Sequence, residues 1–223
     1  KDVGPKTKDC WRVPLLLVEE PAVTADAKSD NPVAIYEADP ASPPTQRAVC
    51  ATLAASKRPH TRGLFTILHV GKIPIAFTEL ERLMPYNWLN DECINGMVTL
   101  MQWRNDRTVA DDPTAPTHYF LNTFFYSKSW HQQKYSYHAV QRWTKNFDAL
   151  ATDKLFIPVN ECNTHWILVV VDNRAGTISL YDSLGARNQR VAESVRLWLV
   201  DEAEHYKTPQ REWQVEHAWC RFQ

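Results

Sequence analysis

Residues 165–182 read HWILVVVDNRAGTISLYD, and this stretch predicts a β-hairpin. Its first part is rich in Val, Ile and Leu, its middle contains turn-forming residues, and its last part alternates between apolar and polar residues. A four-residue loop over 172–175 pairs Val171 with Gly176, and the same register places His165 directly opposite Asp182. We therefore predict that these two side chains share one face of the hairpin, with their Cβ atoms about 5 Å apart.

The predicted pair has the chemistry of a general base. A carboxylate beside an imidazole fixes the tautomer of the ring and stabilises its charged form, as a base that serves a nucleophile requires. Taken singly, His165 is equally a strand residue and Asp182 the start of a turn. A change of one residue in loop length would put the side chains on opposite faces, so their shared face favours the catalytic interpretation.

The composition divides the chain into two regions. Eight of the 14 prolines but only one of the nine tryptophans precede Gly63, and no apolar period persists there. We therefore expect residues 1–62 to form a largely disordered extension. Residues 63–223 are expected to form one α+β domain, because strands and helices alternate there without a repeating β-α period.

Charge and cysteine content narrow the class of protein. The formal net charge is −1, which is not the basic footprint of a nucleic-acid-binding protein. No apolar run approaches the roughly 20 residues of a membrane span, and the first residues lack the apolar segment of a signal peptide. The five cysteines are odd in number and contain no C-x-x-C pair, which favours reduced thiols in the nucleus or cytoplasm. Cys162 and His165 have C-x-x-H spacing without a second ligand pair, so we expect no metal and no other cofactor.

Periodicity also predicts the other elements. Asn90 is suited to cap a helix whose apolar residues recur at i, i+3, i+4 and i+7 and face a core, namely Ile94, Met97, Val98 and Met101. A second amphipathic helix carries Val191, Val195, Trp198 and Leu199. We further expect strands at 64–69, 73–77 and 154–159 and a strand-like stretch at 218–220. A capping box at 78–81 is expected to open a helix that stops at Pro85. We also expect a polar loop at 106–116, a buried aromatic segment at 119–126 and a helix involving 140–145.

Six motifs follow one another along the chain: Trp88-Leu89-Asn90-Asp91, Asn122-Thr123-Phe124-Phe125-Tyr126, Arg142-Trp143-Thr144-Lys145, Ile157-Pro158-Val159-Asn160, His165-Trp166 and Tyr181-Asp182-Ser183-Leu184. Their order resembles that of the SUMO-specific cysteine proteases, the ubiquitin-like-protein proteases. The resemblance implies a papain-like fold with a mixed or antiparallel central sheet flanked by helices. It also implies a monomer that cleaves after the Gly-Gly terminus of SUMO, in SUMO precursors and in SUMO-conjugated proteins.

The same resemblance implies roles for individual residues. His165 is the general base and Asp182 its orienting partner, while Trp88 and Trp166 form the roof and floor of a narrow tunnel. Indole faces about 7 Å apart would admit a Gly-Gly tail and exclude side chains. For both tryptophans, ordinary core packing is the alternative.

Four further residues are implied to face the modifier: Asp91, Asn122, Phe124 and Trp143. Asp91 can instead serve as an acid at a helix N-terminus, where the helix dipole favours it, and both roles can coexist. For Phe124 and Trp143, core packing is the competing interpretation.

The family's nucleophile lies in an Asp-Cys-Gly motif, and no such motif occurs in this chain. Gln223 falls where the family has its oxyanion-hole glutamine, although Arg221-Phe222 replaces the Pro-Gln that often precedes it. Cys220 lacks a following glycine and lies in an apolar stretch, so we expect it to be structural. We therefore expect the catalytic domain over residues 63–223 to be C-terminally incomplete, ending before its nucleophile, and this chain to be inactive as it stands. The alternatives are a SUMO-binding pseudo-protease and a protease for another ubiquitin-like modifier.

Overall fold

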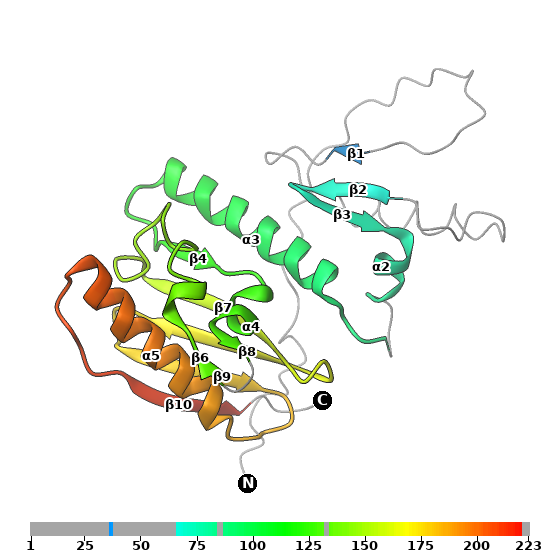
Figure 1. Ribbon diagram of the computed structural model, residues 1–223. Helices are drawn as coiled ribbons and strands as arrows, with labels where there is room; N and C mark the ends of the chain where they lie inside the picture. Colours follow the sequence, from blue (N-terminus) through cyan, green and yellow to red (C-terminus); the bar gives the residue numbers. More distant parts are fainter. Residues whose placement is uncertain (1–35, 38–65, 84–86, 132–133, 220–223) are drawn as a thin grey trace, which may run out of the picture.

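The computed structural model describes residues 36–37, 66–83, 87–131 and 134–219 (Figure 1). Gln223 and Cys220 lie outside these ranges, as does the expected N-terminal extension apart from the two-residue strand β1 (Tyr36–Glu37).

A five-stranded sheet forms the larger part of the fold, in the order β10-β9-β8-β7-β4. Its strands are β4 (His118–Phe120), β7 (Lys154–Glu161), β8 (His165–Asp172), β9 (Thr177–Asp182) and β10 (Gln214–Trp219). The central three strands are antiparallel, whereas β4 runs parallel to β7 and β10 runs parallel to β9. The sheet is therefore mixed, and the predicted α+β class is confirmed.

The β8–β9 hairpin forms where the sequence predicts it, but in a different register. Asp172 pairs with Thr177, and Asp182 pairs with Ile167 instead of His165. The loop lies one residue later than predicted because Gly176 has φ +73°, a left-handed conformation that suits the end of a turn better than a strand. A shift of two positions preserves the face of each side chain. His165 and Asp182 therefore share a face as diagonal neighbours.

Helix α5 (Gln189–Tyr206) packs on one face of this sheet, as Figure 1 shows. The four apolar residues that predict this helix are all buried, and Trp198 has no exposed surface. They form the main core with inward-facing strand residues, which include Leu155, Ile157, Val159, Val169, Val171, Ile178 and Leu180. The apolar period thus correctly predicts both α5 and the buried face of the sheet.

A smaller layer precedes this sheet in the chain. It contains β1, β2 (Thr66–Val70), β3 (Ile73–Ala76) and α2 (Phe77–Glu81), with a separate small core of Val70, Ile75 and Leu80. Helix α2 begins earlier than the predicted capping box, because Glu79 Oε2 accepts a hydrogen bond from Ala76 N at 3.0 Å. The helix also ends at Glu81, earlier than predicted.

Helix α3 (Asp91–Asp111) connects the two parts. Asn90 caps it as predicted, accepting a hydrogen bond from Cys93 N at 3.1 Å. The helix continues through most of the predicted polar loop, so that loop starts at residue 112 and not at 106. The predicted core face is wrong for Met97, which is 54% exposed. The buried positions are Asn95 and Gly96. At position 96 the helix lies close to β3, since a Cβ there would lie 3.4 Å from Ile75.

Two other predictions differ from the structure. The aromatic segment forms β4 and helix α4 (Phe124–Ser129), and Phe125 and Tyr126 are buried, but Phe124 is 47% exposed. Residues 140–145 form tight turns after a 3-10 helix, η1 (Tyr137–Ala139), and not an α-helix. The bond from Trp143 N to Val140 O joins residues three apart, and only Gln141 N bonds to a carbonyl four residues back, that of Tyr137. Trp and Thr also have low helix propensity. The remaining strands, β5 (Trp130–His131) and β6 (Lys134–Tyr135), pair with each other.

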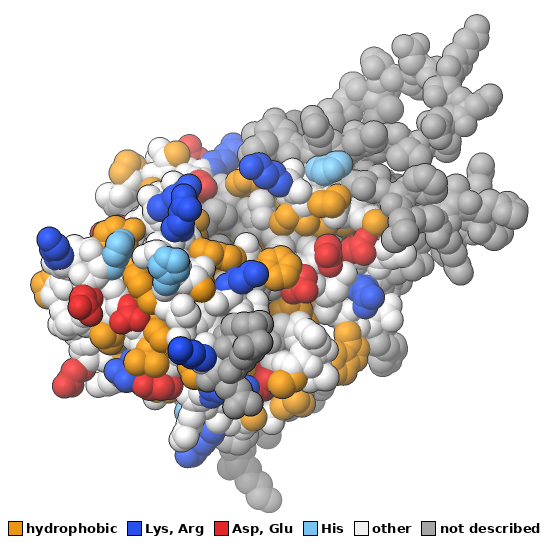
Figure 2. All heavy atoms as spheres, in the orientation of Figure 1, with side chains coloured by type: hydrophobic (Ala, Val, Ile, Leu, Met, Phe, Trp, Pro, Cys, Tyr) orange, Lys and Arg blue, Asp and Glu red, His pale blue; other side chains and the backbone are white. Residues whose placement is uncertain are grey.

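Acidic and basic side chains are interspersed on the face of the molecule drawn in Figure 2. Within the described ranges, no helix has the length and apolar character needed to cross a membrane.

Candidate active site

The centre of the candidate site is the contact between His165 and Asp182. His165 is the first residue of β8 and Asp182 the last residue of β9, so both lie at the same end of the sheet. His165 Nε2 lies 2.6 Å from Asp182 Oδ1, and the two side chains are 16% and 4% exposed. The predicted contact is therefore present, although it arises from diagonal neighbours and not from a directly opposed pair.

Both carboxylate oxygens of Asp182 accept hydrogen bonds. Oδ1 also accepts from Leu184 N at 2.7 Å, and Oδ2 accepts from Asn188 Nδ2 at 2.7 Å. Burial raises the pKa of Asp182, but the hydrogen bonds from His165, Leu184 and Asn188 outweigh burial and lower that pKa below its ordinary value. Asp182 is therefore ionised at neutral pH.

Because Asp182 contacts Nε2 of His165, the two ring nitrogens of His165 have different roles. With the proton held on Nε2 by the carboxylate, Nδ1 presents its lone pair as the basic nitrogen. This is the arrangement of a base with its orienting carboxylate. In this arrangement, the atom of His165 that can accept a proton is Nδ1.

The described cysteines do not contact this base. Cys93 Sγ donates to Glu79 O at 3.0 Å, and burial raises the pKa of the Cys93 thiol, with smaller opposing effects. Cys162 is exposed in the turn between β7 and β8. Neither thiol forms a hydrogen bond with His165, so no nucleophile stands at the base within the part of the chain that the structure describes.

Trp166 connects the base to the segment before α3. Its indole Nε1 donates to Leu89 O at 3.0 Å, which brings the Trp88-Leu89 segment to the start of β8. Trp88 is 66% exposed, so ordinary core packing does not describe it. The two tryptophans therefore belong to neighbouring segments beside the base, and the tunnel between their rings stays a prediction.

Asp91 is the first residue of α3 and is half-buried. Its position fits the alternative role of an acid at a helix N-terminus. The predicted contact between Asp91 and a modifier is compatible with this position and stays a prediction.

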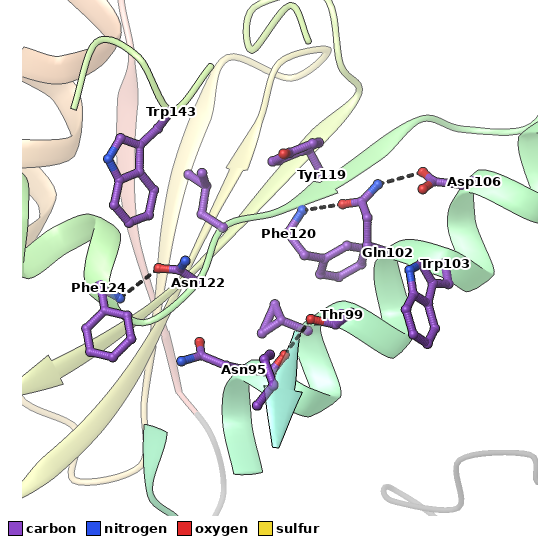
Figure 3. A pocket seen from close by; sticks show the side chains of 13 residues that line it. Asn95, Thr99, Gln102, Trp103, Asp106, Tyr119, Phe120, Asn122, Phe124 and Trp143 are labelled. Carbon is purple, nitrogen blue, oxygen red and sulfur yellow. Dashed lines mark hydrogen bonds between the residues drawn. The ribbon is translucent and has the colours of Figure 1, made fainter. Parts of the chain in front are cut away.

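Asn122, Phe124 and Trp143 line one cavity of about 410 Å³ between α3 and β4. Figure 3 shows Asn122, Phe124 and Trp143 on one side and α3 residues, including Thr99 and Trp103, on the other. Asn122 Oδ1 accepts from Phe124 N at 2.9 Å and fixes the start of α4. Phe124 is exposed, whereas Trp143 also packs edge-on against Phe125 at 5.7 Å between ring centroids. Trp143 thus combines core packing with a place on the cavity wall.

Asn188 was missed by sequence reasoning. It lies six residues beyond Asp182 in an irregular segment, where neither a helical nor a strand period predicts contacts. A polar residue before a helix suggests only an N-cap. Among the described residues, no group of three or more His, Cys, Asp or Glu side chains could hold a metal ion.

The sequence matches the pattern of a known protein family. The pattern of the Ulp1 protease family, C-terminal catalytic domain, matches residues 87–220. Sentrin-specific protease 2 of Homo sapiens is 33% identical over 132 residues, which are 59% of this chain and 21% of that protein. The ubiquitin-like-specific protease ESD4 of Arabidopsis thaliana is 33% identical over 135 residues, which are 59% of this chain and 27% of that protein. The chain therefore spans between 21% and 27% of the length of these two relatives.

Solved structures share the fold. The C-terminal Ulp1 protease domain in complex with Smt3, the yeast ortholog of SUMO, has a TM-score of 0.58 at 24% identity, over 78% of this chain and 72% of that chain. The Chaetomium thermophilum Ulp1-like SUMO protease catalytic domain also has a TM-score of 0.58, at 20% identity, over 78% of this chain and 70% of that chain. At these identities the likeness establishes a common architecture.

Proposed function

Because the chain belongs to the Ulp1 protease family, we propose that the full-length protein is a cysteine protease that cleaves after the Gly-Gly terminus of SUMO. It acts on lysine conjugates of SUMO and on SUMO precursors. The observation that carries this proposal is the 2.6 Å contact between His165 and Asp182 within a matched catalytic domain. The proposed substrate is supported by relatives named sentrin-specific proteases and by a structure of similar fold in complex with Smt3.

In the proposed reaction, His165 Nδ1 takes the proton of a cysteine thiol, and the thiolate attacks the carbonyl of the terminal glycine. The imidazolium then protonates the departing amine, and Asp182 stabilises the charged ring. A water molecule, deprotonated by His165, hydrolyses the thioester and releases the modifier. Gln223, which lies outside the described residues, is the proposed side-chain donor to the oxyanion.

The substrate surface is proposed to have two parts. Trp88 and Trp166 enclose the Gly-Gly tail, which fits the exposure of Trp88 and the bond from Trp166 to Leu89. Asp91, Asn122, Phe124 and Trp143 contact the folded part of the modifier, which fits the exposed ring of Phe124 and the cavity between α3 and β4. We further propose a monomer in the nucleus or cytoplasm, where thiols such as Cys93 and Cys162 stay reduced.

The experiment that tests this function uses the full-length protein and its His165→Ala variant as the matched control. Each is incubated with a SUMO precursor, a SUMO–lysine conjugate and the corresponding ubiquitin substrates, and cleavage is followed by gel electrophoresis. Release of mature SUMO by the wild type alone supports the proposal. Binding of SUMO without cleavage would instead make the protein a pseudo-protease, and preference for ubiquitin would overturn the proposed specificity.

A further inference from the structure

Asn188 occupies a helix-capping position without acting as a side-chain cap. It is the N-cap of α5, and asparagine is among the best N-cap residues because its side-chain oxygen can accept from a first-turn N–H. Here the side chain makes no cap hydrogen bond. Its Nδ2 atom instead donates to Asp182 Oδ2 at 2.7 Å. The side chain thus stabilises a neighbouring carboxylate and not its own helix.

The two oxygens of Asp182 depend on different donors. His165 and Leu184 N both contact Oδ1, whereas Asn188 is the one hydrogen-bond donor to Oδ2 among the residues described. Asp182 is buried, so bulk water is a poor substitute for a lost donor. A carboxylate held at both oxygens resists rotation, and one held only at Oδ1 can turn away from the imidazole.

Packing of the start of α5 limits the movement of Asn188. Val191 and Val195 are buried in the main core. Arg190 Nη2 lies 3.2 Å from Glu161 Oε1, and Glu161 pairs with His165 across β7 and β8. The start of α5 is therefore attached to the main core and to the β7 residue that pairs with His165. Asn188 directly precedes this anchored helix, which limits how far its side chain can move from Asp182.

We propose that Asn188 is a positioning residue: by holding Oδ2 of Asp182, it keeps Oδ1 on His165 Nε2 and so keeps Nδ1 directed at the nucleophile. This role deepens the proposed protease function and rests on it. Asn188 acts through Asp182 and touches no substrate. The direction of the Asp182 pKa agrees with this role, because the Asn188 hydrogen bond is one of the interactions that lower it.

The test separates positioning from helix capping. Asn188→Ser keeps a good N-cap residue but shortens the side chain, so its hydroxyl does not reach Oδ2 as Nδ2 does. Asn188→Ala removes both capacities. Asn105→Ser is the matched control, since Asn105 also uses its amide for hydrogen bonds, to Pro116 O and from His118 N, at a site on α3.

The first readout needs no catalysis. In this chain, the hydrogen-bonded Nε2 proton of His165 is followed by proton NMR and assigned by its loss in His165→Gln, while melting temperature reports the fold. We expect the resonance to be lost in Asn188→Ser and Asn188→Ala and retained in Asn105→Ser, with Asn188→Ser as thermally stable as the wild type. Retention of the resonance in both Asn188 variants would overturn the inference.

The second readout uses the full-length protease. We expect Asn188→Ser to lower kcat/KM by about tenfold or more, with KM unchanged because substrate binding does not involve Asn188. Wild-type kinetics in Asn188→Ser would contradict the positioning role. If the wild type cleaves nothing, the proposed function fails, whereas the NMR result still decides whether Asn188 positions Asp182.

Discussion

The five-stranded sheet with α5 and the layer formed by β2, β3 and α2 differ greatly in their cores. The first region, which we call the thick region, buries a cluster of 18 residues, the thick core. The second, which we call the thin region, buries only the three residues of the thin core, Val70, Ile75 and Leu80, among the residues that the structure describes. His165 and Asp182, the proposed base and its carboxylate, lie on the first region, whereas Trp88 and Asp91 lie between the two, at the start of α3. The proposed base is thus supported by the thick core, on which Trp143 of the proposed modifier-binding residues also packs. Trp88 and Asp91 instead lie at the junction with the thin core.

Hydrogen bonds along α3 join it to the sheet region. Gln102 bonds to His118 O and Phe120 N of β4, and Asn105 bonds to Pro116 O and His118 N. Asn95 Nδ2 donates to Thr123 Oγ1 and Asn95 Oδ1 accepts from Thr123 N, both at 2.9 Å, which attaches α3 to the start of α4. Trp166 donates to Leu89 O. The last of these bonds holds the residue next to Trp88 directly to the strand that begins at His165, and it can be tested separately.

The largest expected effect is on the thick core. Trp198→Ala should lower the free energy of unfolding by about 3–5 kcal/mol, because a fully buried indole leaves a cavity that rigid neighbours cannot fill. Urea denaturation of this chain measures the change. Leu80→Ala in the thin core should cost less, about 2 kcal/mol, because its neighbours can collapse more easily. Equal losses at the two sites would show that the cores do not differ in stability.

The next largest effect is expected at Trp166, whose hydrogen bond to Leu89 O joins the two regions. Trp166→Ala should lower cleavage by the full-length protein about 100-fold, because the Gly-Gly tail is no longer held in position for attack. The half-buried indole contributes less to stability than Trp198, so the fold should persist. Steady-state kinetics with a SUMO precursor measures the loss, and circular dichroism checks the fold. Normal turnover by the variant would show that Trp166 does not form part of the proposed tunnel.

The third prediction concerns pH. The backbone N–H of Thr117 donates to Asp153 Oδ2 at 2.7 Å and lowers the pKa of Asp153. Because the folded pKa lies below the unfolded value of about 4, the stabilisation is present above pH 4 and is lost as the pH falls through the folded pKa. Asp153→Ala should cost about 1 kcal/mol at pH 7 and less at pH 2. Chemical denaturation at both pH values measures the difference, and a pH-independent cost would contradict the ionic origin.

The smallest effect is expected at Asp91. Asp91→Ala should weaken SUMO binding by about 1 kcal/mol, as for a partly desolvated charged contact. Calorimetry on the chain measures the affinity, and the melting temperature reports any loss at the α3 N-terminus. Unchanged affinity with a lowered melting temperature would assign Asp91 to the helix alone.

Local periodicity predicts the elements of the thick region well. The β8–β9 hairpin and α5 follow from alternating and helical patterns, because burial on one face imposes those patterns. The register is wrong by two positions, since the choice of loop residues depends on the backbone of Gly176. The shared face of His165 and Asp182 survives because the error is even.

The thin region and α3 are predicted less well. Helix α3 is longer than expected, and its buried positions, Asn95 and Gly96, are polar or small. These residues are buried because β3 and Thr123 approach closely, and such tertiary contacts leave no periodic signal in the sequence. The contact between Asn188 and Asp182 was missed for the same reason.

The parallel pairing of β10 with β9 has a consequence for any group that attacks the substrate. Trp219 lies opposite Asp182 in this pairing, and neighbouring strands are about 4.8 Å apart. The polypeptide therefore leaves β10 within one strand spacing of the orienting carboxylate. A reactive thiol carried a few residues beyond Trp219 would be tethered to the base by a very short connection, which costs little closure entropy. Strand order alone would then give the thiol a high effective concentration at the imidazole.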